Sequence, residues 1–456
     1  MAITYATALA TLKDAARGVK ASRSPSESQT RVSLEDAVGH VAACDCVSSV
    51  TTPEFDTSAM DGYALRSEAT KHASPQHPVI FEVQQTIAAG DDPFLEEWDS
   101  GIEDDVEPCV EIMTGGRFPD SGAGEVLDAC VRMEDVTIVT SAPRRKLSVG
   151  RKNRIAITKP VPVNANRRFA GADIQKGQLV LKAGQVIRST NLMPLSSAGI
   201  KSVLIEKRPR MGVWSTGKEL LSDTSGVPDV NGIFLTSAGR EFGADAKFMG
   251  VLDDEPDTIT RAIADALVVG QHPDVLVTSG GVSVGKFDFI RRALERMGAT
   301  IVFHGLSIRP GHPVLFALVP SNKGKVAFFG LPGNPGAAAA CFRFIVVPYL
   351  RQITEKGSES PMPAKLIDLE AEAANPARPR MGSPTVGVEG RDLFRPGLLL
   401  MGDGKENTVQ ELGRNQGPSK LWPFLLSNCW IHYKKDQEYR EGYTVDCYPT
   451  SPTNAL

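Results

Sequence analysis

Short apolar runs alternate with helical patterns between residues 208 and 352. Runs rich in β-branched and aromatic residues predict strands, and they lie at 210–216, 246–252, 274–279, 300–308 and 326–331. Helical patterns, such as the one at 257–269, separate several of these runs. This alternation predicts a doubly wound α/β domain, in which helices cover both faces of a parallel sheet.

The pattern differs elsewhere in the chain. Residues 1–50 open with a helical stretch at 5–19, and a second amphipathic pattern at 33–47 begins with a capping-box-like pair, Ser33 and Asp36. Short apolar runs between Gly, Pro and acidic residues predict an inserted small β domain at 51–150. Residues 151–207 read as a linker that continues residues 1–50. Residues 353–456, rich in Pro/Gly turns, predict a C-terminal β domain.

The length, charge and cysteine content of the chain limit which kinds of protein it can be. A chain of 456 residues exceeds a single core, so several domains are expected. A formal net charge of −4 argues against bulk affinity for nucleic acid. Seven scattered cysteines follow neither a disulfide nor a zinc pattern, which indicates a reducing compartment. We find no apolar run that could span a bilayer and no signal peptide, so we expect a cytoplasmic protein without a membrane partner.

Two strand–glycine loop–helix units suggest the chemistry. In a parallel sheet both turns lie beyond the carboxyl ends of the strands, where ligands bind. Such turns aim backbone N–H groups outward, which suits phosphate or another oxyanion, and two of them suggest a sizeable anionic ligand. The loop residues expected to hold it are Ser279, Gly280, Gly281, Ser283, Gly285, Pro332, Gly333, Asn334 and Pro335.

Asp288 closes the first glycine loop. Its carboxylate is ionised at neutral pH and would repel a neighbouring phosphate. A divalent cation between them resolves the conflict, and Mg²⁺ is the best candidate. The other reading of Asp288 is a carboxylate that caps the following helix.

Several motifs occur together in this chain: PEFDTSAMDGYALR (Pro53–Arg66), IMTGGRFP, RFAGADIQKGQ, STGKEL, TSGGVSVGKFDF, RPGHP and LPGNP. In this order they resemble the molybdenum insertase family, which includes bacterial MoeA, the gephyrin E domain and a plant E domain. The resemblance extends from about residue 4 to about residue 350. It implies an elongated MoeA-like fold of several subdomains with a MogA-like α/β domain at 208–352, and a homodimer formed through residues 1–50 and 151–207.

The resemblance also implies an activity, that of a Mg²⁺-dependent molybdopterin molybdotransferase. Members bind molybdopterin adenylate, release AMP and insert molybdate into the dithiolene. Asp288 then serves adenylate cleavage and shares the metal with Asp254. Glu219 belongs to the active site, while Asp61 and Thr114 complete the pocket from the dimer partner. Positions that match cofactor-binding residues are Thr216, Asp229 and Asn231.

Arg309 and His312 lie in the RPGHP segment between the two glycine units. Arg309 is a permanent cation that can grip a dianion such as molybdate by paired hydrogen bonds. His312 adds charge only when it is protonated. Several family members have lysine at both positions. Read locally, this segment and the STGKEL and SAMDGYA runs are also ordinary turns.

Departures from the family pattern keep an alternative open. Lys286 replaces an acid found in many relatives, and Ala337 replaces a serine. With His312, these changes are compatible with a catalytically impaired molybdopterin-binding or scaffold protein on the same fold. An enzyme on another nucleotide-linked substrate is a third reading, which the SAMDGYA and IMTG segments disfavour. The sequence separates neither molybdate from tungstate nor a lone enzyme from one that docks a molybdopterin adenylyltransferase.

Overall fold

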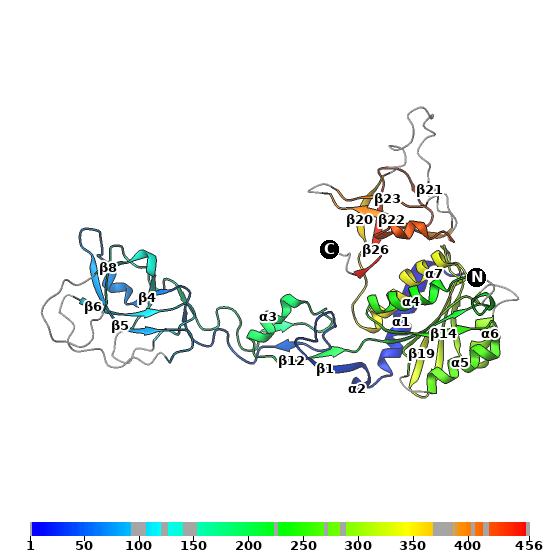
Figure 1. Cartoon of the computed structure of the whole chain (residues 1–456), viewed down its shortest axis with the longest axis horizontal. Helices are drawn as coiled ribbons and strands as arrows, with labels where there is room; N and C mark the ends of the chain where they lie inside the picture. The colour runs from blue at the N-terminus through cyan, green and yellow to red at the C-terminus, as the bar shows by residue number, and fades with distance from the viewer. Residues whose placement is uncertain are drawn as a thin grey trace, which may run out of the picture.

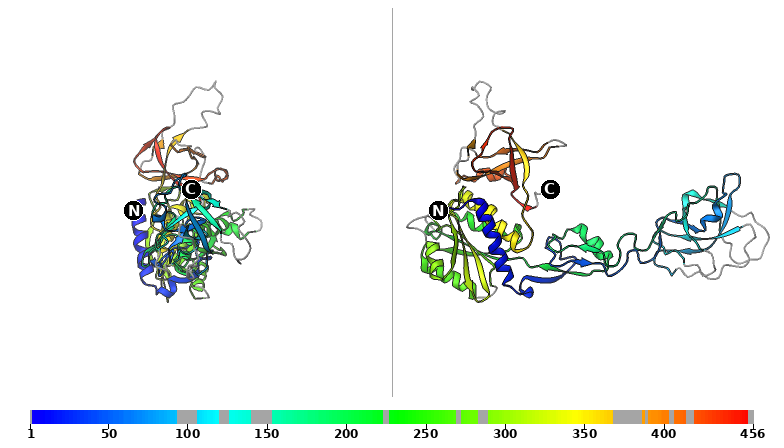
Figure 2. Two further views of the ribbon diagram at one scale, coloured as in Figure 1. Left: turned by 90° about the vertical axis from the view of Figure 1, so that its left-hand side faces the viewer. Right: turned by 180° about the vertical axis from the view of Figure 1, so that it is seen from behind.

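The computed structural model describes residues 2–92, 106–119, 126–139, 153–222, 227–268, 272–282, 289–367, 386–387, 390–402, 406–413 and 419–452. These residues form an elongated molecule with a narrow middle (Figure 1). An α/β domain and a β-barrel lie at one end, a small β domain lies at the other, and a thin linker joins them, as the view from behind also shows (Figure 2). Among the described residues, no helix is long and apolar enough to cross a membrane.

A six-stranded sheet forms the centre of the α/β domain, in the order β14-β13-β15-β19-β18-β16. The strands are β13 (Arg210–Thr216), β14 (Asp245–Leu252), β15 (Val275–Ser279), β16 (Thr300–His304), β18 (Leu315–Ser321) and β19 (Gly324–Leu331). The neighbours β14, β13, β15 and β19 are parallel. The predicted α/β fold is therefore confirmed.

The predicted parallel sheet also contains one antiparallel strand, β18, which none of the predicted runs covers. β18 runs antiparallel to both β19 and β16. Ser321 pairs with Gly324, so only two residues connect β18 to β19. A connection this short permits only an antiparallel hairpin, because a parallel crossover needs roughly a dozen residues. The predicted strand at 300–308 also stops at His304, and β17 (Ile308–Arg309) joins the barrel instead.

Helices cover both faces of this sheet. One face carries α1 (Tyr5–Ala21), α4 (Val230–Glu241), α7 (Pro335–Cys341) and α8 (Val347–Ile353), and the other carries α5 (Pro256–Val268) and α6 (Phe289–Arg296). The buried residues of α1 are spaced three or four positions apart, as an amphipathic helix requires. They are Tyr5, Ala8, Leu12, Ala16 and Val19. The first helix of the chain therefore packs in the core of the α/β domain.

The linker contains two short antiparallel pairs and one helix. β1 (Gln29–Ser33) follows α2 (Pro25–Ser28) and pairs with β12 (Ser202–Glu206). β2 (Cys46–Val47) pairs with β11 (Leu179–Leu181), next to α3 (Ser189–Ser197).

The amphipathic pattern at 33–47 does not form a helix. The Asp36 N–H donates to the Ser33 hydroxyl at 3.3 Å, as the capping signature suggests. Gly39, however, has a φ of +83°, which is incompatible with a right-handed helix. Val41 and Ala42 then form bridges to Val186 and Ile205. Pairing with distant segments therefore outweighs the local helical pattern.

The far β domain is a six-stranded sheet in the order β7-β4-β6-β5-β9-β8. Its strands are β4 (Gly62–Leu65), β5 (Val79–Ile87), β6 (Val106–Ile112), β7 (Ala129–Arg132), β8 (Thr137–Val139) and β9 (Arg154–Ile157). Because β9 pairs with β5 and β8, the sheet continues past residue 150. The short pair β3 (Thr57–Ser58) and β10 (Arg167–Arg168) lies at its boundary with the linker.

The C-terminal region forms the predicted β domain. It contains β20 (Met362–Ile367), β22 (Asp392–Leu400), β23 (Thr408–Glu411), β24 (Cys429–Tyr433) and β26 (Thr444–Pro449), besides the short pair β21 (Val386–Gly387) and β25 (Glu438–Tyr439). Pairing of β22 with β24 closes these main strands into a barrel. β17 of the α/β region extends the sheet alongside β22, which ties the two domains together.

Phe344 anchors the barrel on the helices below it. The ring stacks on Phe394 of β22 at a centroid distance of 3.8 Å and meets Trp430 edge to face. We expect Phe344→Ala to destabilise the protein by about 3–5 kcal/mol, because it empties a fully packed aromatic site. Leu425→Ala, at a side chain that is 83% exposed, should change stability by less than about 0.5 kcal/mol. Equal denaturation midpoints for the two variants would contradict this assignment.

Candidate functional site

The carboxyl ends of β13, β15 and β19 meet at one edge of the sheet. The Gly280 N–H donates to the Leu331 carbonyl at 2.9 Å, so the two glycine loops begin side by side. Asn231, in the first turn of α4, donates through Nδ2 to both Ser279 Oγ and the Gly333 carbonyl, each at 2.8 Å. One amide therefore fixes both loops relative to each other.

Asp229 positions this amide. Its side chain caps α4 and accepts a hydrogen bond from the Gly232 N–H at 2.9 Å. An N-cap carboxylate stabilises a helix start and fixes the direction in which the first turn points. Ser279 completes the link, since its hydroxyl donates to the Pro332 carbonyl at 3.2 Å. The structure thus brings Asp229, Asn231, Ser279 and both loops together.

Gly280 and Thr216 form the floor of the first loop. Thr216, buried at the end of β13, donates through Oγ1 to the Ser279 carbonyl at 3.3 Å. Gly280 has a φ of +102°, and a Cβ there would lie 2.5 Å from Thr216 Oγ1. Gly281 also has a positive φ, +67°. Both positions require glycine. The predicted site residues Ser283, Gly285 and Asp288, and the departure at Lys286, lie outside the described residues.

Two predicted carboxylates gather beside this floor. Burial first, and then the negative charge of Glu219, raise the pKa of Asp254 above its ordinary value. Asp254 follows β14 and Glu219 follows β13, so neighbouring parallel strands deliver both side chains to the same edge. Carboxylates in this arrangement are donors that Mg²⁺ accepts together with substrate phosphates. The described residues contain no cluster of three or more metal-ligating side chains.

The raised pKa of Asp254 predicts that removing this charge stabilises the protein but lowers its activity. Since the folded state disfavours the charged carboxylate, Asp254 lowers the free energy of unfolding above its unfolded pKa, and this penalty disappears as the pH falls. Asp254→Asn should therefore raise the melting temperature at neutral pH while lowering activity. The gain should shrink as the pH falls toward the ordinary aspartate pKa of about 3.9 and be absent below it, where the carboxyl group is protonated in both the folded and the unfolded state. A lower melting temperature at neutral pH would contradict the prediction; Asp245→Asn serves as the control.

The RPGHP segment lies between the sheet and the barrel. Arg309 is exposed on β17, and its backbone lies opposite Leu393 in the parallel pair of β17 and β22. His312 Nδ1 lies 2.6 Å from the Leu306 carbonyl, which accepts a hydrogen bond, so Nδ1 carries a proton. A neutral ring in this orientation presents Nε2 as an acceptor, and only protonation makes Nε2 a donor. His312 therefore supplies a donor to an anion at Nε2 only in its charged form.

The second glycine loop contacts the barrel. Asn334 occupies the N-cap position of α7 without a capping hydrogen bond from its side chain, and it donates through Nδ2 to Ser419 Oγ at 2.7 Å. Its Oδ1 is buried and has no hydrogen-bond partner among the described residues. Sequence reasoning missed Ser419, since no local pattern links residues that lie 85 positions apart. Pro335 follows at the first helical position, where proline is favoured. Ala337 is buried in the same turn.

Asp61 and Thr114 lie together but far from the other predicted residues. Asp61 Oδ1 accepts from both the Thr114 N–H, at 2.6 Å, and the Thr114 hydroxyl, at 2.8 Å. These hydrogen bonds, the backbone one first, lower the pKa of the Asp61 carboxyl. The pair lies in the β domain at the opposite end of the elongated chain from the α/β sheet (Figure 1). Within one chain, therefore, Asp61 and Thr114 do not reach the glycine loops.

Comparison with known proteins adds family evidence to this geometry. Residues 3–199 match the model of the MoeA N-terminal region (domain I and II), and residues 212–352 match a probable molybdopterin binding domain. The chain is 31% identical to the molybdopterin molybdenumtransferase of Synechococcus elongatus over 70% of this chain and 74% of that protein. It is 28% identical to the enzyme of that name from Haemophilus influenzae, over 96% of this chain and 98% of that protein.

A solved structure shares the whole architecture. The crystal structure of the molybdopterin biosynthesis MoeA protein from Pyrococcus horikoshii is 26% identical and superposes with a TM-score of 0.72. The match covers 99% of this chain and 100% of that chain. The similarity therefore includes the C-terminal barrel, which the sequence motifs matched only loosely.

Proposed function

This chain belongs to the MoeA family of molybdopterin molybdenumtransferases, and from that premise we propose how its own residues carry out the reaction. The protein is a transferase that inserts molybdenum during molybdenum cofactor biosynthesis. In our proposal the substrates are molybdopterin adenylate and molybdate, and AMP is released. The observation that carries this proposal is the Asn231 amide, which holds the two anion-binding loops as one surface.

The two loops bind the phosphorylated pterin in this proposal. The backbone N–H groups beyond Ser279 and Pro332 donate to phosphate oxygens, as strand-to-helix turns commonly do. Thr216 and Asn231 keep these groups in place without a rearrangement during the reaction. Arg309 supplies the positive charge that molybdate requires.

Asp254, with Glu219 beside it and Asp288 from the loop, would hold Mg²⁺. The donor set fits, because burial first and then the negative charge of Glu219 raise the pKa of Asp254, and a bound cation would offset both effects. Bound Mg²⁺ supplies neutralisation of the phosphate charge and polarisation of the phosphoanhydride. Asp288 would orient the attacking water. Asp288→Ala should leave the fold intact while adenylylated pterin accumulates.

A homodimer completes the site in this proposal. Asp61 and Thr114 lie in the far β domain, too distant in space to reach the loops of their own copy. A second copy would therefore supply them to the site. The seven cysteines are all free, which supports a reducing compartment such as the cytosol as the place of action.

The test of this function is release of AMP. We expect Asn231→Ala to slow AMP release about 10–100-fold, because displacing catalytic groups by about 1 Å costs that much. The matched control is Glu241→Ala at the exposed end of the same helix, which should keep full activity. The substrates supplied are molybdopterin adenylate, molybdate and Mg²⁺. Pterin binding without any AMP release by the unaltered protein would favour the scaffold alternative.

A further inference from the structure

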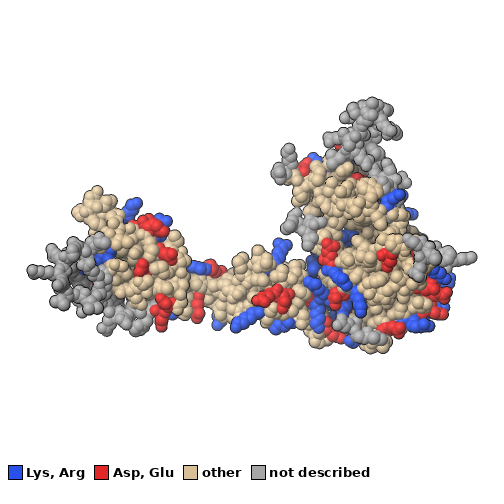
Figure 3. Space-filling model, in the orientation of Figure 1, with Lys and Arg blue, Asp and Glu red and all other residues tan. Residues whose placement is uncertain are grey.

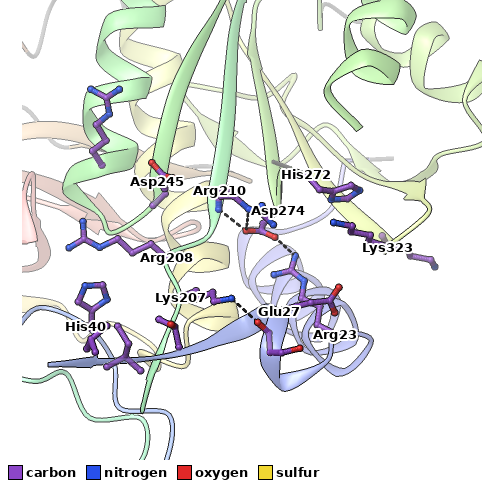
Figure 4. Close-up of a pocket in the computed structure, with 17 residues that line it drawn as sticks. Arg23, Glu27, His40, Lys207, Arg208, Arg210, Asp245, His272, Asp274 and Lys323 are labelled. Atoms are coloured by element: carbon purple, nitrogen blue, oxygen red, sulfur yellow. Dashed lines mark hydrogen bonds and ion pairs between the residues drawn. The ribbon is translucent and has the colours of Figure 1, made fainter. Parts of the chain in front are cut away.

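A cavity lies at the amino ends of β13 and β19, whereas the glycine loops of the proposed active site follow the carboxyl ends of the strands. Figure 4 shows the side chains that line this cavity. It has a volume of about 810 Å³. Thr30, Val32 and Ile205 of the linker form one wall. The other wall comes from the amino ends of the sheet strands, with Arg210 at the start of β13 and Lys325 near the start of β19. The cavity therefore lies at the junction of the linker and the α/β domain.

Positive charge dominates this junction cavity. Seven Lys and Arg side chains line it against three Asp and Glu, among the described residues: Arg23, Lys207, Arg208, Arg210, Arg240, Lys323 and Lys325 against Glu27, Asp245 and Asp274. Basic side chains also gather at this junction on the molecular surface (Figure 3). Asp274 already bonds Arg23 at 2.9 Å and the Arg210 N–H at 2.6 Å. The acidic side chains therefore neutralise only part of the positive charge that lines the cavity.

The remaining cations face backbone or solvent. Lys207 donates to the Ser26 carbonyl at 2.7 Å and Arg240 to the Ala246 carbonyl at 2.8 Å, neither of which cancels a charge. Within the described part of the chain, the exposed Arg208, Lys323 and Lys325 form no ion pair. Cations held close together without counter-charges favour the binding of an anion.

A buried polar atom gives a second, independent indication. His272 lines the cavity and is only 7% exposed, yet its Nε2 has no hydrogen-bond partner among the described residues. A buried polar atom without a partner is unfavourable, so a ligand group that reached Nε2 would stabilise it. No Phe, Tyr or Trp side chain lines the cavity among the described residues, so the lining favours phosphate groups over a pterin or a base.

We propose that the junction cavity is a binding site for a small polyphosphate anion, separate from the molybdopterin site. Guanidinium and ammonium groups from both walls would each bind phosphate oxygens. Lys207 and Arg208 lie on the segment that connects β12 to β13, so a bound polyphosphate would brace the linker against the α/β domain.

The test is calorimetry of the full chain with inorganic tripolyphosphate near physiological salt. The unaltered protein should bind it, and the triple variant Arg208→Ala, Lys323→Ala, Lys325→Ala should bind at least about 10-fold more weakly, as lost phosphate contacts predict. The matched control replaces three exposed linker lysines with alanine and so removes the same amount of charge: Lys176, Lys182 and Lys201. It should bind as the unaltered protein does. Equal weakening in both would indicate nonspecific attraction and overturn the proposal.

Two further comparisons separate this site from others. Asn231→Ala, which alters the proposed active site, should leave tripolyphosphate binding unchanged; its loss there would assign the anion to the active site and overturn the proposal. ATP should bind about as well as tripolyphosphate if only the phosphates are recognised, since no Phe, Tyr or Trp side chain lines the cavity among the described residues. A strong preference for ATP would instead indicate a nucleotide site and contradict the polyphosphate assignment.

The pH dependence provides a readout that a purely structural role would not move. Burial first, and then Lys323, lower the pKa of His272; Arg210 lowers it further, whereas Asp274 opposes them. His40 also lines the cavity, and burial first and then Arg208 lower its pKa. A bound anion would offset the cations and raise the pKa of both histidines, so binding should tighten as the pH falls from about 8 to about 6. His272→Gln should reduce that pH dependence while keeping binding at pH 8. An unchanged pH dependence would remove His272 from the site.

Discussion

Mixing two inactive variants, Asp61→Ala and Asp288→Ala, restores about a quarter of the AMP release of the unaltered enzyme if the site is shared between two copies. Asp61 lies in the far β domain, whereas the glycine loops lie in the α/β domain at the other end of the chain. A mixed dimer would contain one site with both changes and one with neither. Random pairing makes about half of the dimers mixed, and each has one intact site of two.

The experiment needs co-expression with two different tags, or unfolding and refolding of a mixture, followed by a measurement of AMP release. The matched control is Asn231→Ala with Asp288→Ala. Both residues belong to the same half of the proposed site, so mixed dimers contain no intact site and mixing should restore nothing beyond the activity of Asn231→Ala itself. If the Asp61 and Asp288 pair also recovers nothing although mixed dimers form, the proposal of a shared site is wrong.

The internal geometry of the Asp61 pair suggests why the loss should be large. Thr114 donates two hydrogen bonds to one oxygen of Asp61, which fixes the carboxylate and keeps it ionised. A carboxylate held in this way on an exposed surface contributes little to a core. Asp61→Ala should therefore remove activity at small cost in stability, and the melting temperature should stay within a few degrees of its original value.

The sequence predicted the α/β domain because its strands are long, apolar and strongly β-branched. The run at 326–331 is an example, and it is buried throughout in β19. Periodicity reports the type of an element but not the direction of its neighbours. The periodicity therefore predicted neither the short turn between Ser321 and Gly324 nor the antiparallel strand β18.

The candidate site could be predicted in part for the same reason. Parallel strands deliver the residues that follow them to one edge, so Thr216, Ser279 and Gly333 lie close together without further information. The hydrogen bond from Asn334 to Ser419 depends on how a separate barrel docks. No pattern within a few residues records that docking. The same holds for the failed helix at 33–47, where bridges to distant segments decide the conformation.

Gly280→Ala should slow AMP release by about two orders of magnitude, because the added methyl group would displace the first glycine loop by about 1 Å. The Cβ would lie 2.5 Å from Thr216 Oγ1 and 2.6 Å from the Thr216 carbonyl oxygen. A backbone oxygen cannot rotate away as the end of a side chain can. The loop must therefore move, and the hydrogen bond from the Gly280 N–H to the Leu331 carbonyl moves with it.

A matched variant separates this steric effect from backbone strain. Gly250 on β14 has a φ of +108°, close to the +102° of Gly280, but a Cβ there would meet nothing within 4 Å. Gly250→Ala should therefore lose about as much stability from the unfavourable φ, roughly 1 kcal/mol, and keep nearly all of its activity. Equal losses of AMP release in the two variants would show that strain alone impairs the enzyme. A loss confined to Gly280→Ala would instead show that the position of the loop above Thr216 sets the rate, since only that variant forces the loop away from the sheet edge.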